Sequence, residues 1–174
     1  MRGWRFIIAS VVTLAALPVA GGTAAARSKS PTAAQIRRAV RHAERSSALW
    51  ATVNICDTPK YRLVIGIRGE MPALGFAAQL RMTFMIDYAA GTGFKPLHGV
   101  ADPVSLGNPR SGVYQGGVRF TFGPHAGVLR GRVRFSWWLG KRTVGKVVRT
   151  TTAGHHGVSY GDPRGFSAAR CSMA

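Results

Sequence analysis

Side chains that could act as general acids, bases or hard-metal ligands are few and scattered in this chain. The 174 residues include only 6 carboxylates, namely Glu44, Asp57, Glu70, Asp87, Asp102 and Asp162. Asp57, Asp102 and Asp162 each precede a proline directly or within two residues, which is common in turns. Distant carboxylates can meet in a folded protein, so a secreted hydrolase with a dispersed acidic site is the alternative interpretation. No local pattern favours it, and we expect a non-enzymatic protein without catalytic residues.

Histidines form the only set that resembles a metal site. His155 and His156 are adjacent, with His98 and His125 elsewhere in the chain. Neighbouring residues on a strand point to opposite faces, and a loop pair has no fixed geometry, so exposed loop histidines are the simpler interpretation. The sequence also contains no nucleophile elbow, zinc-protease helix motif or phosphate-binding glycine loop. We therefore expect neither a metal site nor a cofactor.

The 2 cysteines, Cys56 and Cys171, are too few for a four-cysteine zinc site or a disulfide-rich miniprotein. They also lack the C-x-x-C spacing that is common in redox-active thiol pairs. An isolated pair in an exported protein is most simply a disulfide, which here would join the two ends of the domain. Metal binding by the two thiolates is the weaker alternative.

Basic residues are the most abundant functional groups. The chain has 24 Lys+Arg and a formal net charge of +18. Arg130, Arg132 and Arg134 alternate along one predicted strand, so they should stand about 6–7 Å apart on one side of it. The predicted basic face also takes in cations of the adjoining strands and hairpin, namely Arg119, Lys141, Arg142, Lys146 and Arg149.

Two adjacent tryptophans must point to opposite faces of the same strand. Trp137 shares the apolar side with Phe135 and belongs to the core, whereas Trp138 lies on the side of the arginines. Arg119, Arg130, Arg132, Arg134, Trp138 and Arg149 are thus the candidate residues for contact with an anionic cell-envelope polymer or a membrane surface. The alternative is a solvated face whose arginines reflect codon usage. No motif that reads DNA or RNA is present, so no specific nucleic-acid partner is expected.

The N-terminal residues predict export. Arg2 and Arg5 precede an uncharged, mostly apolar stretch from Phe6 to Ala20, and small residues follow at 24–26. The apolar stretch is shorter than the roughly 20 residues of a membrane-spanning helix, so a cleavable signal over residues 1–26 is favoured over an anchor. We expect a secreted product.

A short helix is predicted from Pro31 to about Arg45, within a linker segment over residues 27–47. Ser30 and Pro31 form a plausible cap and first turn, and Thr32 with Gln35 could form a capping box. Its apolar face is thin: Ile36, Val40 and Ala43. The helix is interpreted as weakly docked or mobile, with a basic helix on an anionic surface as the alternative.

From residue 48 onward the hydrophobic period is two, which is typical of strands. Strands are predicted over residues 50–56, 62–68, 79–88, 117–122, 128–139, 143–152 and 167–173, with a short edge strand near 94–97. The strand over 62–68 should stop at Gly69 and Pro72. Seven to eight short strands without alternating helices predict an all-β, antiparallel β-sandwich domain over residues 48–174.

Several runs also resemble a group of uncharacterised secreted bacterial proteins with an immunoglobulin-like β-sandwich. These runs are LWATVNICDT at 49–58, IGIRGEMP at 65–72, VLRGRVRFSWW at 128–138 and SAARC at 167–171. The resemblance implies an immunoglobulin-like fold closed by the cysteine of the final strand, but no activity. The wide cysteine spacing differs from that of antibody domains. We therefore expect a secreted binding or structural module.

Overall fold

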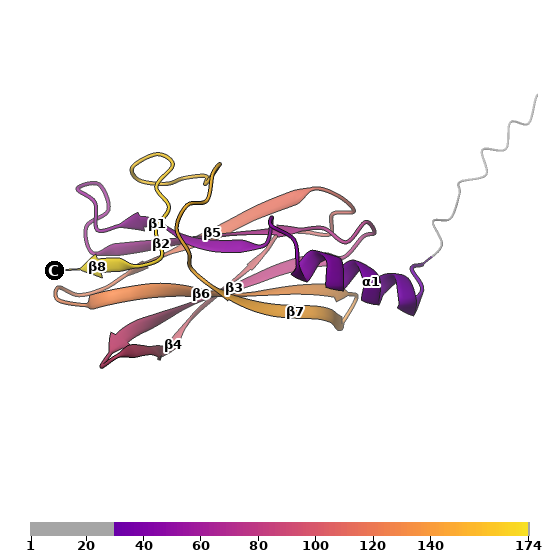
Figure 1. Ribbon diagram of the computed structural model, residues 1–174, viewed down its shortest axis with the longest axis horizontal. Coiled ribbons are helices and arrows are strands. Elements are labelled where there is room, and N and C mark those ends of the chain that lie inside the picture. The colour runs from indigo at the N-terminus through magenta and orange to yellow at the C-terminus, as the bar shows by residue number, and fades with distance from the viewer. Residues whose placement is uncertain (1–29, 174) are drawn as a thin grey trace, which may run out of the picture. The chain divides into compact units, whose positions relative to one another are not determined.

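A computed structural model describes residues 30–173 of the chain (Figure 1). The predicted export signal over residues 1–26 lies outside the described residues. Helix α1 spans Ala33–Glu44, close to the predicted range. The capping box is confirmed, because the Thr32 hydroxyl accepts from the Gln35 backbone N–H and the Gln35 side chain accepts from the Thr32 N–H. Thr32, and not Ser30, is therefore the N-cap residue.

The rest of the described chain is mostly β-structure. Its strands are β1 Trp50–Cys56, β2 Val64–Pro72, β3 Gln79–Ala90, β4 Gly93–Ser105, β5 Val113–Thr121, β6 Gly127–Leu139, β7 Arg142–Thr150 and β8 Cys171–Met173. They form a three-stranded sheet of order β1-β2-β5 and a five-stranded sheet of order β4-β3-β6-β7, in which β8 also pairs with β6. All these strand pairs are antiparallel. The prediction of an all-β, two-sheet sandwich is confirmed.

The core lies between the inner faces of the two sheets. In the three-stranded sheet Val53, Ile65 and Ile67 are fully buried. On β3 and β6 the predicted alternation is confirmed for the fully buried residues Leu80, Met82, Phe84, Ile86, Val133, Phe135 and Trp137. A Cβ atom placed on Gly131 would lie 2.6 Å from Ile67 Cδ1, so a glycine is required at this contact between the two sheets.

Several strand boundaries differ from the prediction. Strand β2 continues through Gly69 to Pro72, because Gly69 pairs with both neighbouring strands. Strand β4 is far longer than the predicted segment near 94–97, and it lies at the edge of its sheet. The edge position accommodates Pro96 and Pro103, whose missing N–H groups would interrupt a central strand. The last strand is shorter than predicted, and only Cys171–Met173 pair with β6.

Helix α1 packs against β7 through the three residues of its predicted apolar face, Ile36, Val40 and Ala43. A Cβ atom on Gly145 of β7 would lie 2.6 Å from Val40 Cγ1, so the helix lies directly on the strand. The Arg149 guanidinium donates to the Glu44 carbonyl at 2.7 Å, which satisfies one of the unpaired carbonyls at the helix C-terminus.

The segment from Thr151 to Arg170, called the long loop below, leaves β7 and crosses to β1 of the other sheet before it returns to β8 (Figure 1). An isolated antiparallel bridge joins Val53 to Ala168. The predicted disulfide is confirmed: Cys56 at the end of β1 is bonded to Cys171 in β8, with their Cα atoms 5.3 Å apart. The bridge and the disulfide hold the C-terminal end of the long loop, and the Thr152 N–H holds its start by donating to the Ala51 carbonyl at 2.8 Å.

Candidate functional site

The arginines of β6 lie on the outer face of the five-stranded sheet. Arg130, Arg132 and Arg134 alternate with the buried residues of that strand, as predicted. Register places Asp87 opposite Arg130, and Thr83 opposite Arg134. We use the term basic face for this surface, whose cations on β3, β6 and β7 are Arg81, Arg130, Arg132, Arg134 and Lys146.

Asp87 neutralises one end of the basic face. Its carboxylate is 3% exposed and lies 3.1 Å from Arg130 Nη2 and 3.3 Å from Arg132 Nε. The Arg130 guanidinium also covers the Phe94 ring at 4.3 Å from its centroid. A buried carboxylate needs such partners because an unpaired charge is costly to remove from water. Arg130 and Arg132 therefore stabilise Asp87 and are only partly available to a ligand.

The other end of the basic face surrounds Ser136. Arg81 and Lys146 pair directly with Ser136 from the two neighbouring strands, and Arg134 lies two residues along β6. Arg134 and Lys146 are exposed, and within residues 30–173 none of these three cations has a carboxylate at ion-pair distance. Like charges this close repel one another, so a bound anion would relieve the repulsion.

Trp138 lies on the basic face, as predicted, but its ring already has a cationic neighbour. The Arg81 guanidinium lies 4.7 Å from the Trp138 ring centroid, and the indole N–H donates to Ser136 Oγ at 3.0 Å. Trp138 therefore belongs to the same group of side chains around Ser136 as Arg81.

Two predicted residues do not belong to this face. Arg119 was expected on a strand beside β6, which is wrong: it stands on β5 of the three-stranded sheet and pairs with Gly66. Arg149 pairs with the core residue Val133, so it lies on the inner side of β7, where it binds the end of α1. The basic face consequently retains Arg130, Arg132, Arg134 and Trp138 of the predicted set.

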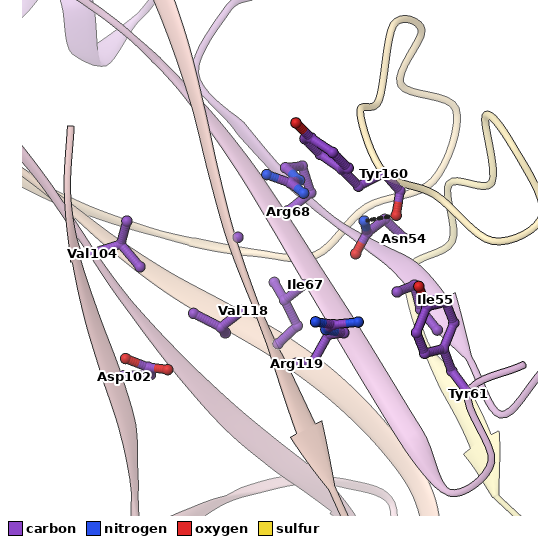
Figure 2. A pocket seen from close by; sticks show the side chains of 11 residues that line it. Asn54, Ile55, Tyr61, Ile67, Arg68, Asp102, Val104, Val118, Arg119 and Tyr160 are labelled. Atoms are coloured by element: carbon purple, nitrogen blue, oxygen red, sulfur yellow. Dashed lines mark hydrogen bonds between the residues drawn. The ribbon is translucent and has the colours of Figure 1, made fainter.

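A cavity of about 730 Å³ is associated with the three-stranded sheet (Figure 2). Its lining residues are Asn54, Ile55, Tyr61, Ile67, Arg68, Asp102, Val104, Gly117, Val118, Arg119 and Tyr160. Figure 2 shows β5 running between two groups of them. Asp102, Val104 and Val118 lie on one side, whereas Arg68, Arg119 and both tyrosines lie on the other. We call the second side the arginine–tyrosine groove.

Asp57, Glu70 and Asp162 hold structural contacts rather than forming a shared centre. Asp57 accepts from the Leu63 N–H at 2.7 Å, and Asp162 is hydrogen-bonded to Thr58. Glu70 accepts from Trp50 Nε1 and from Gln115 Nε2 at 2.9 Å each. Within the described part of the chain, no three histidine, cysteine or acidic side chains are grouped as metal ligands would be.

His155 is partly buried on the three-stranded sheet. Its ring stacks on Trp50 with centroids 4.6 Å apart, and its Nε2 lies 2.7 Å from Thr152 Oγ1. Burial lowers the pKa of His155. The nearby Glu70 carboxylate acts to raise this pKa, and the neighbouring His156 acts to lower it further. The folded chain thus binds this proton less tightly than the unfolded chain does.

We expect the free energy of unfolding to fall as the pH drops below about 6.5, where the unfolded histidine gains its proton first. His155→Phe keeps a ring on Trp50 but cannot titrate, so its free energy of unfolding should decline less over the same range. Urea denaturation of both proteins on either side of this pH measures the difference. Equal declines would show that His155 does not contribute.

Sequence reasoning missed two features of these surfaces. The sequence predicts no contact for Asp87, whose burial beneath two arginines depends on the β3–β6 register. The arginine–tyrosine groove combines β2, β5, the connection between β1 and β2, and the long loop. No local pattern in the sequence indicates it, because it depends on the pairing of β2 with β5.

Comparison of the chain with protein-family models and with curated protein sequences finds no match. The described residues contain no helix that is long and apolar enough to cross a membrane. The Cys56–Cys171 disulfide is compatible with an extracellular location, since such bonds persist in oxidising compartments.

Proposed function

We propose that the chain is a secreted, non-enzymatic binding module whose basic face holds an anionic polymer of the cell envelope. The observation that carries the proposal is the cluster around Ser136. Arg81, Arg134 and Lys146 meet there without a carboxylate at ion-pair distance in the described chain. These cations repeat along the strand at alternate residues and across the sheet from strand to strand. Such a regular array suits a polymer with repeated negative groups.

We also infer an immunoglobulin-like arrangement for the sandwich. The sheet orders β1-β2-β5 and β4-β3-β6-β7 correspond to the orders A-B-E and C′-C-F-G of that fold. The additional strand β8 and its disulfide to β1 distinguish this domain from antibody domains, in which the disulfide joins B and F. The arrangement supports a binding role only by analogy.

The test is retention on dextran sulfate across a series of sodium chloride concentrations. Arg134→Glu combined with Lys146→Glu should weaken binding by about tenfold or more, because two attractive contacts become repulsive. The matched control is Arg37→Glu with Arg38→Glu, which makes the same change of net charge on exposed residues of α1. This control should weaken binding much less.

An equal loss in both double variants would contradict the proposal, since binding would then depend only on net charge. Retention that does not fall with added salt would contradict it as well. Vesicles containing phosphatidylglycerol test the alternative of a membrane surface. Binding to these vesicles without binding to the polymer would favour that surface instead.

The hydrolase alternative needs two carboxylates, or a carboxylate and a histidine, that face the same cavity. Asp102 is the one residue of these types that lines the cavity of about 730 Å³. The geometry of the described residues therefore favours binding.

A further inference from the structure

The arginine–tyrosine groove contains two arginines that each lie against a tyrosine ring. The Arg68 Cζ atom is 4.9 Å from the centroid of Tyr160, and the Arg119 Cζ atom is 5.2 Å from that of Tyr61. Lys60 adds a third cation at 5.1 Å from the Tyr61 centroid. In the described chain neither arginine has a carboxylate at ion-pair distance, and Asp102, the carboxylate that lines the cavity, lies on the other side of β5.

A glycine on the neighbouring strand gives Arg68 its room. Arg68 of β2 pairs with Gly117 of β5, and Arg119 of β5 pairs with Gly66 of β2. A Cβ atom on Gly117 would lie 2.9 Å from both Cζ and Nε of Arg68. The guanidinium therefore rests directly against the backbone of the edge strand, in space that a side chain would otherwise fill.

Arg68 is held in an environment that leaves part of its hydrogen-bonding capacity unused. Its Nε atom is buried and has no hydrogen-bond partner. Burial lowers the pKa of Arg68, which means that the surroundings disfavour its charge, although Tyr160 opposes this effect. Because Nε is closed off against Gly117, Arg68 could donate to a ligand only through its terminal Nη atoms.

Tyr160 is positioned by the long loop at a conformational cost. The residue has φ 56°, a left-handed conformation that non-glycine residues rarely adopt, and it is 82% exposed. Asn54 Nδ2 donates to the Tyr160 carbonyl at 3.0 Å and to that of Ser159 at 3.3 Å, which fixes this part of the loop. An exposed aromatic ring in a strained, anchored segment is a feature of binding sites.

We propose that the arginine–tyrosine groove binds an acidic sugar residue, with its carboxylate between Arg68 and Arg119 and its ring against Tyr160. Planar guanidinium groups match a carboxylate through paired N–H donors, and the exposed tyrosine offers an apolar face for the sugar ring. The groove lies on the three-stranded sheet, so this site is separate from the basic face and does not depend on it.

The test titrates the protein with glucuronate and follows the side-chain N–H signal of Arg68 by nuclear magnetic resonance. The signal is assigned by its loss in Arg68→Lys. We expect saturable shifts with glucuronate, none with neutral glucose, and weaker binding of inorganic sulfate, which is more highly charged but lacks the sugar ring. Saturation with glucose, or sulfate binding as tight as that of glucuronate, would overturn the acidic-sugar assignment.

Variants separate the contribution of the arginines, which contact the carboxylate, from that of Tyr160, which contacts the sugar ring. Arg119→Gln, at an exposed position, should weaken glucuronate binding by about tenfold, and Tyr160→Ala should weaken glucuronate but not sulfate. The control Arg134→Glu/Lys146→Glu changes only the basic face and should leave glucuronate binding intact.

Absence of any shift in the unaltered protein overturns this proposal without affecting the dextran sulfate result. Loss of glucuronate binding in the control would assign the sugar to the basic face.

Discussion

Replacing both Cys56 and Cys171 with alanine is expected to lower the free energy of unfolding by about 4–5 kcal/mol. The bond links positions separated by 115 residues, so it removes much of the freedom of the unfolded chain. It also retains β8, whose three residues form a short pairing with β6. Urea denaturation of the oxidised protein and of the double variant measures the difference.

The reduced, unaltered protein is the control for the loss of the bond without a change of side-chain volume. It should lose nearly as much stability as the double variant. If both lose less than about 1 kcal/mol, the loop-closure explanation is wrong, because a loop of this size should contribute several times more.

Trp137→Ala is expected to cost about 3–5 kcal/mol of unfolding free energy. The Trp137 side chain is fully buried between the sheets, and its indole N–H donates to the Pro72 carbonyl at 2.9 Å. Truncation therefore leaves a large cavity and an acceptor without its partner. The free energy of unfolding from chemical denaturation, followed by far-ultraviolet circular dichroism, provides the measurement.

Trp138→Ala removes the same type of side chain from the next position of β6. Trp138 lies on the outer face, where water can replace its contacts, so this control should cost no more than about 1 kcal/mol. Similar losses in the two variants would contradict the assignment of the two tryptophans to opposite faces.

The sequence predicted the fold best where alternation is regular and the apolar residues are large. On β6 every second residue from Leu129 to Trp137 faces the core, and the strand lies close to its predicted range. Strand β4 was mostly missed because glycines and prolines interrupt its pattern, although an edge position tolerates them. Local sequence cannot show which strands lie at an edge.

Only part of the candidate site was predicted, because local sequence does not show which strands share a sheet. Arg119 lies shortly before β6 in the sequence, yet β5 and β6 belong to different sheets. Arg149 and Lys146 are three residues apart on one strand, an odd spacing that puts them on opposite sides. That separation could have been recognised from alternation alone. The pairing of Arg68 with Gly117 could not, because it depends on long-range register.

The edge strand β4 has a consequence for how copies of this domain behave when crowded together. Its two prolines lack backbone donors, and its pairing with β3 shifts register between Met85 and Asp87. A neighbouring molecule therefore finds no regular ladder of hydrogen-bonding groups along this border on which to add a strand. Such an edge disfavours fibrils that would grow by strand addition along this border.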